Sequence, residues 1–482
     1  MTNLSDLFPA GAGKQVSFVA DGTLSNGQTV ILNADGTVSG VSGVTEGVGS
    51  EAVYNSAASY YNSVVFDSDS NKVVAAYKDG GNSDFGTAVV GTVSGTSISW
   101  GTPVVFESAA VNSSSATFDS NSNKVVIGYG DEGNSEYGTA IVGTVSGTSI
   151  SFGTAVVFES ATSYYNVATF DSDSNKVVIS YRDAGNSSYG TGIVGTVSGT
   201  AISFGTAVVF ASGTTYNVAA TFDSNSNKVV IGYTNASSSD YGTSVVGTVS
   251  GTAISFGTPV VFNAAEAVYI AATYDSTAQK VVISYMDGGS SPSNKGTAIV
   301  GTVSGTTISF GTEVVFDATS SNSMSNVYDA NANKVVIAYQ AASTGYVIVG
   351  TISGTSISFG TEVVFNAIDT SNISAVYNST DNKIVIGFKD TGNSNYGTGI
   401  VFTVGSTTNT SFVGIADAAI SDTASGNITV KGGIAVNGLS SLTPGSDYYV
   451  QADGSISTVT TSPAVKLGRA LSATSIDLEY QS

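Results

Sequence analysis

Tyrosine and asparagine side chains recur together along the chain, and the pair is typical of carbohydrate recognition. A tyrosine ring can stack on a sugar face, while an amide can pair with sugar hydroxyls. The stretch Thr162-Ser-Tyr-Tyr-Asn166 is one example, and related stretches recur about every 52 residues. We therefore treat the following as candidate ligand-binding residues: Tyr60, Tyr61, Asn62, Tyr164, Tyr165, Asn166, Tyr216, Asn217 and Tyr269. The structural alternative is that these rings pack against the ends of strands.

A second recurrent group consists of aspartates that end a β-rich run and begin a turn. A ring of such carboxylates could hold cations or accept hydrogen bonds from sugar hydroxyls, although a turn-starting aspartate needs no ligand to explain it. Asn235 and Ala341 occupy the equivalent positions in two copies. The candidate acids are Asp79, Asp131, Asp183, Asp287 and Asp390.

A third group has the pattern Asp-x-Asp/Asn-x-Asn, which places oxygen side chains at alternate positions as calcium loops do. The glycine and the distal glutamate of an EF-hand loop are missing, so hydrogen-bonded turns are the competing interpretation. Degenerate copies at residues 275–279 and 378–382 favour that interpretation. Calcium is the one cofactor that the sequence leaves open. Its candidate ligands are Asp67, Asp69, Asn71, Asp119, Asp171, Asp173 and Asp223.

The elements that must position these residues belong to a tandem repeat. A lysine followed by two or three aliphatic residues recurs at intervals of 52, 52, 52, 52, 54 and 49 residues. In the third copy, residues 164–170, 176–181, 189–197 and 201–210 read as four short strands joined by Gly/Asn/Asp turns, with a bend expected at Gly205. The repeated lysines are Lys72, Lys124, Lys176, Lys228, Lys280, Lys334 and Lys383.

Seven four-stranded meanders predict an all-β fold, a seven-bladed β-propeller with small β segments at both ends. The seventh copy lacks its last strand, and residues 49–56 resemble the segment that is missing, residues 153–160 in the second copy. We therefore expect the N-terminal segment to complete the last blade. The alternative is an open β-solenoid, which would need capping units instead.

Two sets of aromatic residues recur at fixed places in the repeat, and we expect them to fill the wedge between adjacent blades. The first set is Trp100, Phe152, Phe204, Phe256, Phe310 and Phe359. The second set is Tyr77, Tyr129, Tyr181, Tyr233, Tyr285, Tyr339 and Phe388.

Composition excludes several kinds of function. The chain of 482 residues has 57 glycines, 6 prolines and a formal net charge of −21, which disfavours nucleic acid and anionic membranes as partners. It has no cysteine and no histidine, so disulfides, thiolate or imidazole metal sites and Ser-His-Asp catalysis are impossible. Its two arginines, Arg182 and Arg469, cannot form a sialidase-type arginine triad. We expect no enzymatic activity, because the acids recur by copy and form no asymmetric pair.

The chain divides by composition into three expected regions: a β-hairpin anchor (1–46), the propeller (47–410) and a small C-terminal β domain (411–482) for assembly or attachment. The first residues lack a basic segment and a long apolar run, so we expect no signal peptide and no membrane insertion.

The C-terminal region resembles small β domains of bacteriophage tail-fibre and other virion proteins. The resemblance rests on residues 442–450 (LTPGSDYYV), 452–454 (ADG) and 465–474 (VKLGRALSAT). The opening stretch 7–18 (LFPAGAGKQVSF) is similar to the starts of marine phage structural proteins. No enzyme family resembles the repeats themselves.

This resemblance implies a virion appendage, tail-fibre-like or capsid-decorating, that takes part in attachment to the host surface. It also implies other virion proteins and host surface glycans as partners, a homo-oligomer such as a trimer, and a virion or extracellular location. The alternatives are a secreted or cell-surface adhesin or lectin and, third, a polysaccharide-degrading enzyme.

Overall fold

The computed structural model describes residues 14–289, 294–408, 411–460 and 465–479. The chain forms two compact units, one from residues 47–404 and one from residues 1–46 together with 405–482. No helix within the described ranges is long and apolar enough to cross a membrane.

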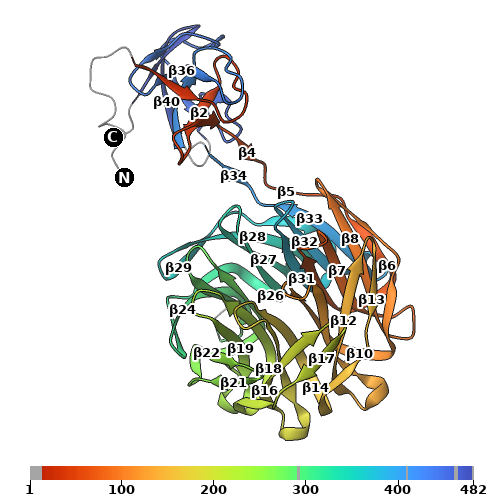
Figure 1. The fold of residues 1–482 in the computed structure, drawn as a ribbon. Coiled ribbons are helices and arrows are strands. Elements are labelled where there is room, and N and C mark those ends of the chain that lie inside the picture. The colour runs from red at the N-terminus through yellow and green to blue at the C-terminus, as the bar shows by residue number, and fades with distance from the viewer. Residues whose placement is uncertain (1–13, 290–293, 409–410, 461–464, 480–482) are drawn as a thin grey trace. The chain divides into compact units, whose positions relative to one another are not determined.

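The first unit is the predicted propeller, in which each blade is an antiparallel meander of four strands. The innermost strand of the first six blades is the second half of a 16-residue strand whose first half belongs to the preceding blade. Figure 1 shows the blades following one another in chain order. These long strands are β6 (Ala52–Asp67), β10 (Val104–Asp119), β14 (Val156–Asp171), β18 (Val208–Asp223), β22 (Val260–Asp275) and β26 (Val314–Asp329). Between the sixth and seventh blades the strand is interrupted: β30 (Val363–Asn366) belongs to the sixth blade and β31 (Thr370–Asn378) to the seventh.

The other strands of the blades have nearly constant lengths. The second strands are β7 (Lys72–Asp79), β11 (Lys124–Asp131), β15 (Lys176–Asp183), β19 (Lys228–Asn235), β23 (Lys280–Asp287), β27 (Lys334–Ala341) and β32 (Lys383–Asp390). The third strands are β8 (Phe85–Ser94), β12 (Tyr137–Ser146), β16 (Tyr189–Ser198), β20 (Tyr241–Ser250), β24 (Lys295–Ser304), β28 (Thr344–Ser353) and β33 (Tyr396–Thr403). The short pieces that begin the fourth strands are β9 (Ser97–Trp100), β13 (Ser149–Phe152), β17 (Ala201–Phe204), β21 (Ala253–Phe256), β25 (Thr307–Phe310), β29 (Ser356–Phe359) and β5 (Gly47–Val48). Single 3₁₀ turns follow four of the second strands: η1 (Glu132–Asn134), η2 (Ala184–Asn186), η3 (Ala236–Ser238) and η4 (Thr391–Asn393).

The ring closes as the sequence predicts. In the last blade β33 pairs with β5 and with the first half of β6, so the N-terminal side of the unit supplies the missing fourth strand. The expected bend at Gly205 is also present, because residues 205–207 separate β17 from β18. A side chain at Gly205 would place its Cβ 1.9 Å from the carbonyl oxygen of Thr252 in the next blade, and only glycine allows that approach.

Aromatic side chains fill the wedges between blades, which confirms that prediction. Phe158, on the outer strand of one blade, lies 5.2 Å from the ring of Tyr181 and 5.6 Å from that of Phe204, both in the next blade. Tyr181 is fully buried. The equivalent contacts recur around the ring, and such pairs stabilise the packing beyond the apolar area that they bury.

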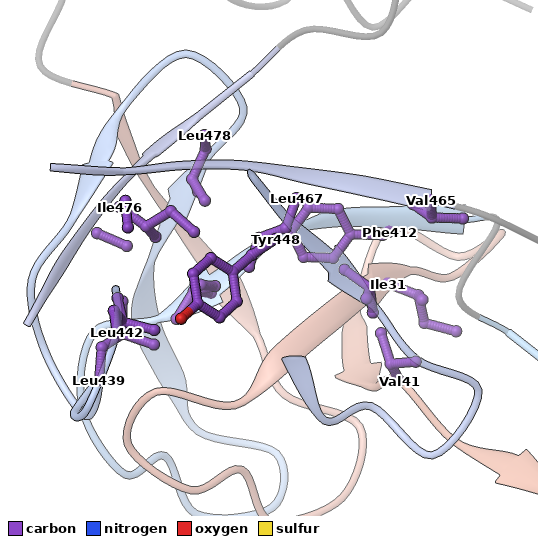
Figure 2. Packing of buried hydrophobic residues seen from close by; sticks show 14 residues of the cluster. Ile31, Val41, Phe412, Leu439, Leu442, Tyr448, Val465, Leu467, Ile476 and Leu478 are labelled. Atoms are coloured by element: carbon purple, nitrogen blue, oxygen red, sulfur yellow. The ribbon is translucent and has the colours of Figure 1, made fainter. Parts of the chain in front are cut away.

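The second unit corrects the expectation of separate N- and C-terminal regions. β1 pairs with β36, and β2 pairs with β35, so both segments contribute to one five-stranded sheet. Ile31 and Val41 pack with Phe412, Leu467 and other C-terminal residues in one hydrophobic core (Figure 2). The strands are β1 (Gln15–Val19), β2 (Thr29–Leu32), β3 (Val38–Gly40), β4 (Gly43–Val44), β34 (Ser406–Thr407), β35 (Phe412–Ala416), β36 (Ser425–Val430), β37 (Ile434–Ala435), β38 (Asp447–Val450), β39 (Ile456–Ser457), β40 (Val465–Ser472) and β41 (Ser475–Leu478).

Candidate functional site

Each inner strand contains a β-bulge at the point where it enters its blade. In the third blade the pairing of β14 with β15 shifts between Tyr164 and Val167, and Tyr165 between them has a left-handed φ of 52°. In every blade the strand continues through the bulge, and in the seventh blade the shift lies between Ser371 and Ser374 of β31. The residues with left-handed φ at this position are Tyr61, Ser113, Tyr165, Asn217, Tyr269, Ser323 and Asn372.

The bulges of neighbouring blades are hydrogen bonded to one another. The backbone N–H of Tyr61 donates to Oδ1 of Asn372 at 3.0 Å, and that of Tyr165 donates to Oγ of Ser113 at 3.1 Å. The N–H of Tyr269 donates to Oδ1 of Asn217 at 3.2 Å. Each bulge tyrosine therefore donates its backbone N–H to the small polar residue at the bulge of the preceding blade. The three tyrosine side chains stay accessible, with exposed fractions of 43%, 37% and 45% for Tyr61, Tyr165 and Tyr269.

These bulges surround a hollow of about 680 Å³ within the propeller unit. Seven of the sequence-predicted residues line it: Tyr61, Asn62, Tyr164, Tyr165, Asn166, Asn217 and Tyr269. Sequence reasoning missed the other lining residues: Ser113, Ser114, Val167, Arg182, Val218, Ser323 and Asn372. Two features of the sequence could have indicated some of them. Alignment of the repeats places the serines and Asn372 at the same positions as the predicted residues, and Arg182 is one of only two arginines in the chain.

The predicted amides are largely occupied by the fold. Oδ1 of Asn62 accepts from the Ser59 hydroxyl at 2.6 Å, and its Nδ2 donates to the carbonyl of Asn372 at 3.2 Å. Nδ2 of Asn217 donates to the Thr234 hydroxyl at 3.2 Å. Asn166 accepts from Ser163 at 3.0 Å, and its buried Nδ2 has no partner among the described residues. Of these three amides, Asn166 is the one whose Nδ2 makes no hydrogen bond among the described residues, so both of its N–H groups stay available to a ligand.

Three tyrosine rings surround Arg182; Tyr164 and Tyr165 line the hollow, whereas Tyr216 is not among the lining residues. The guanidinium carbon of Arg182 lies 4.5 Å from the ring centroid of Tyr164, 5.3 Å from that of Tyr165 and 5.1 Å from that of Tyr216. Burial raises the pKa of the Tyr165 phenol, and the charge of Arg182 opposes that rise. Tyr60 is not among the lining residues; its ring lies 5.0 Å from Nζ of Lys389.

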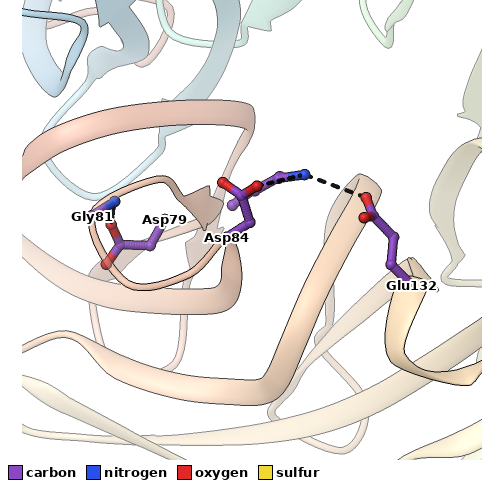
Figure 3. Close-up of polar contacts among 5 residues, drawn as sticks. Asp79, Gly81, Asp84 and Glu132 are labelled. Atoms are coloured by element: carbon purple, nitrogen blue, oxygen red, sulfur yellow. Dashed lines mark hydrogen bonds and ion pairs between the residues drawn. The ribbon is translucent and has the colours of Figure 1, made fainter.

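The aspartates of the second group lie on the same side of the blades as the bulges, because Ser59 pairs with Asp79 and Ser163 with Asp183. None of the five is among the residues that line the hollow. Oδ1 of Asp79 accepts from the N–H of Gly81 at 2.9 Å (Figure 3). Asp183, Asp287 and Asp390 accept backbone N–H groups in the same way, whereas Oδ1 of Asp131 is buried without a partner among the described residues. The geometry therefore favours the turn role over a ligand-facing ring.

The Asp-x-Asp/Asn-x-Asn loops are the hairpins at the opposite end of the inner strands. Oδ1 of Asp67 accepts from the N–H groups of Asp69 and Ser70, both at 3.0 Å, and Oδ2 accepts from the Ser70 hydroxyl at 2.7 Å. Asp119, Asp171 and Asp223 make the same two backbone contacts. Asn378 makes them in the seventh blade, so the position does not need a charge.

The last residue of each hairpin has a left-handed φ, 52° at Asn71 and 54° at Asn175. Asparagine is favoured there because its short side chain tolerates this backbone region. Within the described residues no group of three or more acids is placed to hold a metal ion. Turn geometry thus explains the residues of this pattern, and calcium binding stays a prediction that the geometry does not support.

The fold has solved counterparts. A lectin from Burkholderia pseudomallei superposes with a TM-score of 0.53 at 11% identity, covering 73% of this chain and 98% of its own. The β-propeller domain of Swd1 from Myceliophteria thermophila gives 0.49 at 7% identity, covering 74% and 100%. A chain of the mitotic checkpoint complex gives 0.48 at 11% identity, covering 74% and 93%. No protein-family model and no curated protein matches the chain. The chain is a β-propeller protein, and identities this low show the fold alone.

Proposed function

We propose that the protein is a non-enzymatic attachment protein whose propeller binds a surface glycan in the hollow among the bulges. The observation that carries this proposal is the presence of exposed tyrosines at three of seven left-handed bulge positions. Their aromatic faces and the nearby hydroxyls and amide suit the alternating apolar faces and polar edges of a sugar.

The bulge itself does not require tyrosine. Asn217 and Asn372 occupy the same position in two other blades, with φ of 47° and 51°. Asparagine tolerates this conformation, whereas a bulky side chain there costs on the order of 1–2 kcal/mol. Packing does not explain the choice either, because the rings of Tyr61 and Tyr269 remain 43% and 45% exposed. A ligand supplies the missing reason for tyrosine, since strained backbone persists where function uses it.

The setting that we propose is a virion appendage, and the support for it is the resemblance of residues 442–474 to tail-fibre domains. A secreted or cell-surface adhesin is the second setting; a solved propeller of similar fold is described as a lectin. Mass spectrometry of purified phage particles and of culture supernatant from the host distinguishes the two. Release of reducing ends from host polysaccharide would contradict the non-enzymatic part of the proposal.

The binding site is tested by a glycan array with the wild-type chain and the double variant Tyr61→Asn/Tyr269→Asn. Both substitutions install a residue that the fold already accepts at this position. We expect glycan binding by the wild type and a loss of at least about tenfold in the variant, because buried aromatic contacts dominate such interfaces. Gln279→Asn is the matched control: it installs the same residue at a left-handed position of the opposite strand end, outside the hollow, and it should bind as the wild type does. Absence of binding, or binding that the double variant retains, would overturn the proposal.

A further inference from the structure

Arg182 is an arginine without an acidic partner in a strongly acidic protein. The chain contains 36 acids, yet the ion pairs among the described residues involve only Lys78 and Lys466. Nε of Arg182 is buried and has no hydrogen-bond partner in the described part of the chain. No carboxylate in the described part of the chain therefore forms an ion pair with this arginine.

The three tyrosine rings fix the guanidinium by cation–π contacts. The ring of Tyr164 is itself held, because its hydroxyl donates to Oε2 of Glu136 at 2.8 Å. Tyr165 and Tyr216, from adjacent blades, meet edge to face at 6.1 Å. Rings of this kind orient a guanidinium and leave its charge and its donors for another group.

Three of the six equivalent residues in other blades are bonded within the protein. Of the rest, Gly130 and Met286 have no polar side chain, and Lys389 contacts the ring of Tyr60. Lys78 forms ion pairs with Asp84 and Glu132, both at 3.3 Å (Figure 3). The Thr234 hydroxyl donates to the carbonyl of Ala267, and Gln340 donates to Asp369. Arg182 differs from these residues in lining the hollow with its donors unused.

A second buried donor lines the same hollow, since Nδ2 of Asn166 has no partner among the described residues. We infer that the ligand carries an acidic group, a carboxylate or a sulfate, and that Arg182 binds it with Asn166 beside it. This inference rests on the proposed glycan-binding function and adds the chemical class of the ligand. Guanidinium is suited to both groups because it offers paired, charge-assisted donors.

The charge of the whole protein limits the ligand further. A net charge of −21 repels a polyanion that extends beyond the hollow. The acidic group should therefore be isolated on an otherwise neutral glycan, as in a sialylated or singly sulfated oligosaccharide.

The test uses matched pairs of probes: sialyllactose with lactose, and a singly sulfated galactose disaccharide with its desulfated form. We expect the wild type to prefer one acidic probe over its neutral partner, and the two pairs distinguish carboxylate from sulfate. Arg182→Met should lower the affinity for the preferred acidic probe by about 10- to 100-fold, the usual range for a charge-assisted hydrogen bond, and leave the neutral probe unaffected. If this variant unfolds, Arg182→Gln replaces it, because glutamine already stands at this position as Gln340.

Lys176→Met is the matched control, because it removes the same charge from the other end of the same strand, β15. It should leave both affinities unchanged. Equal binding of acidic and neutral probes, or unchanged binding by Arg182→Met, would overturn the inference. If acidic and neutral probes bind equally and Tyr61→Asn/Tyr269→Asn abolishes that binding, the inference fails and the proposed function stands. If no glycan on the array binds, both fail.

Discussion

Both ends of each inner strand have a residue with a left-handed φ, but the residue types at the two ends differ. At the hairpin end, the left-handed residue is asparagine in six blades and Gln279 in the remaining one. At the bulge end, the left-handed position holds three tyrosines, two serines and two asparagines. The hairpin end holds mostly asparagine, which the left-handed backbone region favours. The bulge end, which lines the hollow, holds mostly tyrosine and serine, which that region does not favour. The difference separates what the fold requires from what a ligand would require.

The largest effect on stability should come from the hairpin aspartates. Asp171→Ala leaves two backbone N–H groups without their acceptor and should lower the free energy of unfolding by about 2 kcal/mol. Asp171→Asn should cost less than about 1 kcal/mol, because Asn378 already makes the same contacts in its own blade. Denaturant unfolding of the two variants measures the difference. An equal loss in both would show that the charge matters and would revive a cation-binding role.

The left-handed hairpin residue should have a smaller effect. Asn175→Ala places a Cβ-bearing residue without a local hydrogen-bonding group at a φ of 54° and should cost about 1 kcal/mol. Asn175→Gly should be neutral to within about 0.5 kcal/mol, because glycine adopts this backbone region freely. The same unfolding experiment checks both variants. A large loss in the glycine variant would mean that the asparagine side chain has another role.

Replacement of a bulge tyrosine should raise the free energy of unfolding, whereas the hairpin substitutions lower it. Tyr269→Asn relieves backbone strain at a φ of 52° and should raise the free energy of unfolding, by up to about 1 kcal/mol, while it weakens glycan binding. Thermal unfolding combined with a binding assay measures the two changes together. A clear loss of stability would show that the tyrosine is a packing residue after all, and the contrast between the two strand ends would disappear.

Addition or removal of calcium should have the smallest effect on stability. The carboxylate of Asp67 is already occupied by its own turn, so addition of calcium or of a chelator should shift the melting temperature by less than about 1 °C. Differential scanning calorimetry is the measurement. A rise of several degrees with calcium would contradict the interpretation of these loops as simple turns.

Much of the fold was predictable because the sequence repeats the pattern of one blade seven times. The period near 52 residues, the aliphatic run after each lysine and the turn residues between runs predict four strands per copy. The missing last strand of the seventh copy predicted the ring closure that β33 makes with β5 and β6. Pairing between residues 15–19 and 425–430 was not predictable, since these strands lie about 400 positions apart and share no repeat.

The sequence alone determined the blade, its number of copies, the aromatic wedges and the candidate tyrosines, because each of these depends on local spacing and side-chain size. Only the tertiary structure decided which of those tyrosines share a hollow and that Arg182 lies among them without an acidic partner. The physical reason is the bulge: a shift in pairing at each inner strand turns one residue per blade to the left-handed region. That shift brings side chains from separate blades, which no local pattern relates, around a single site.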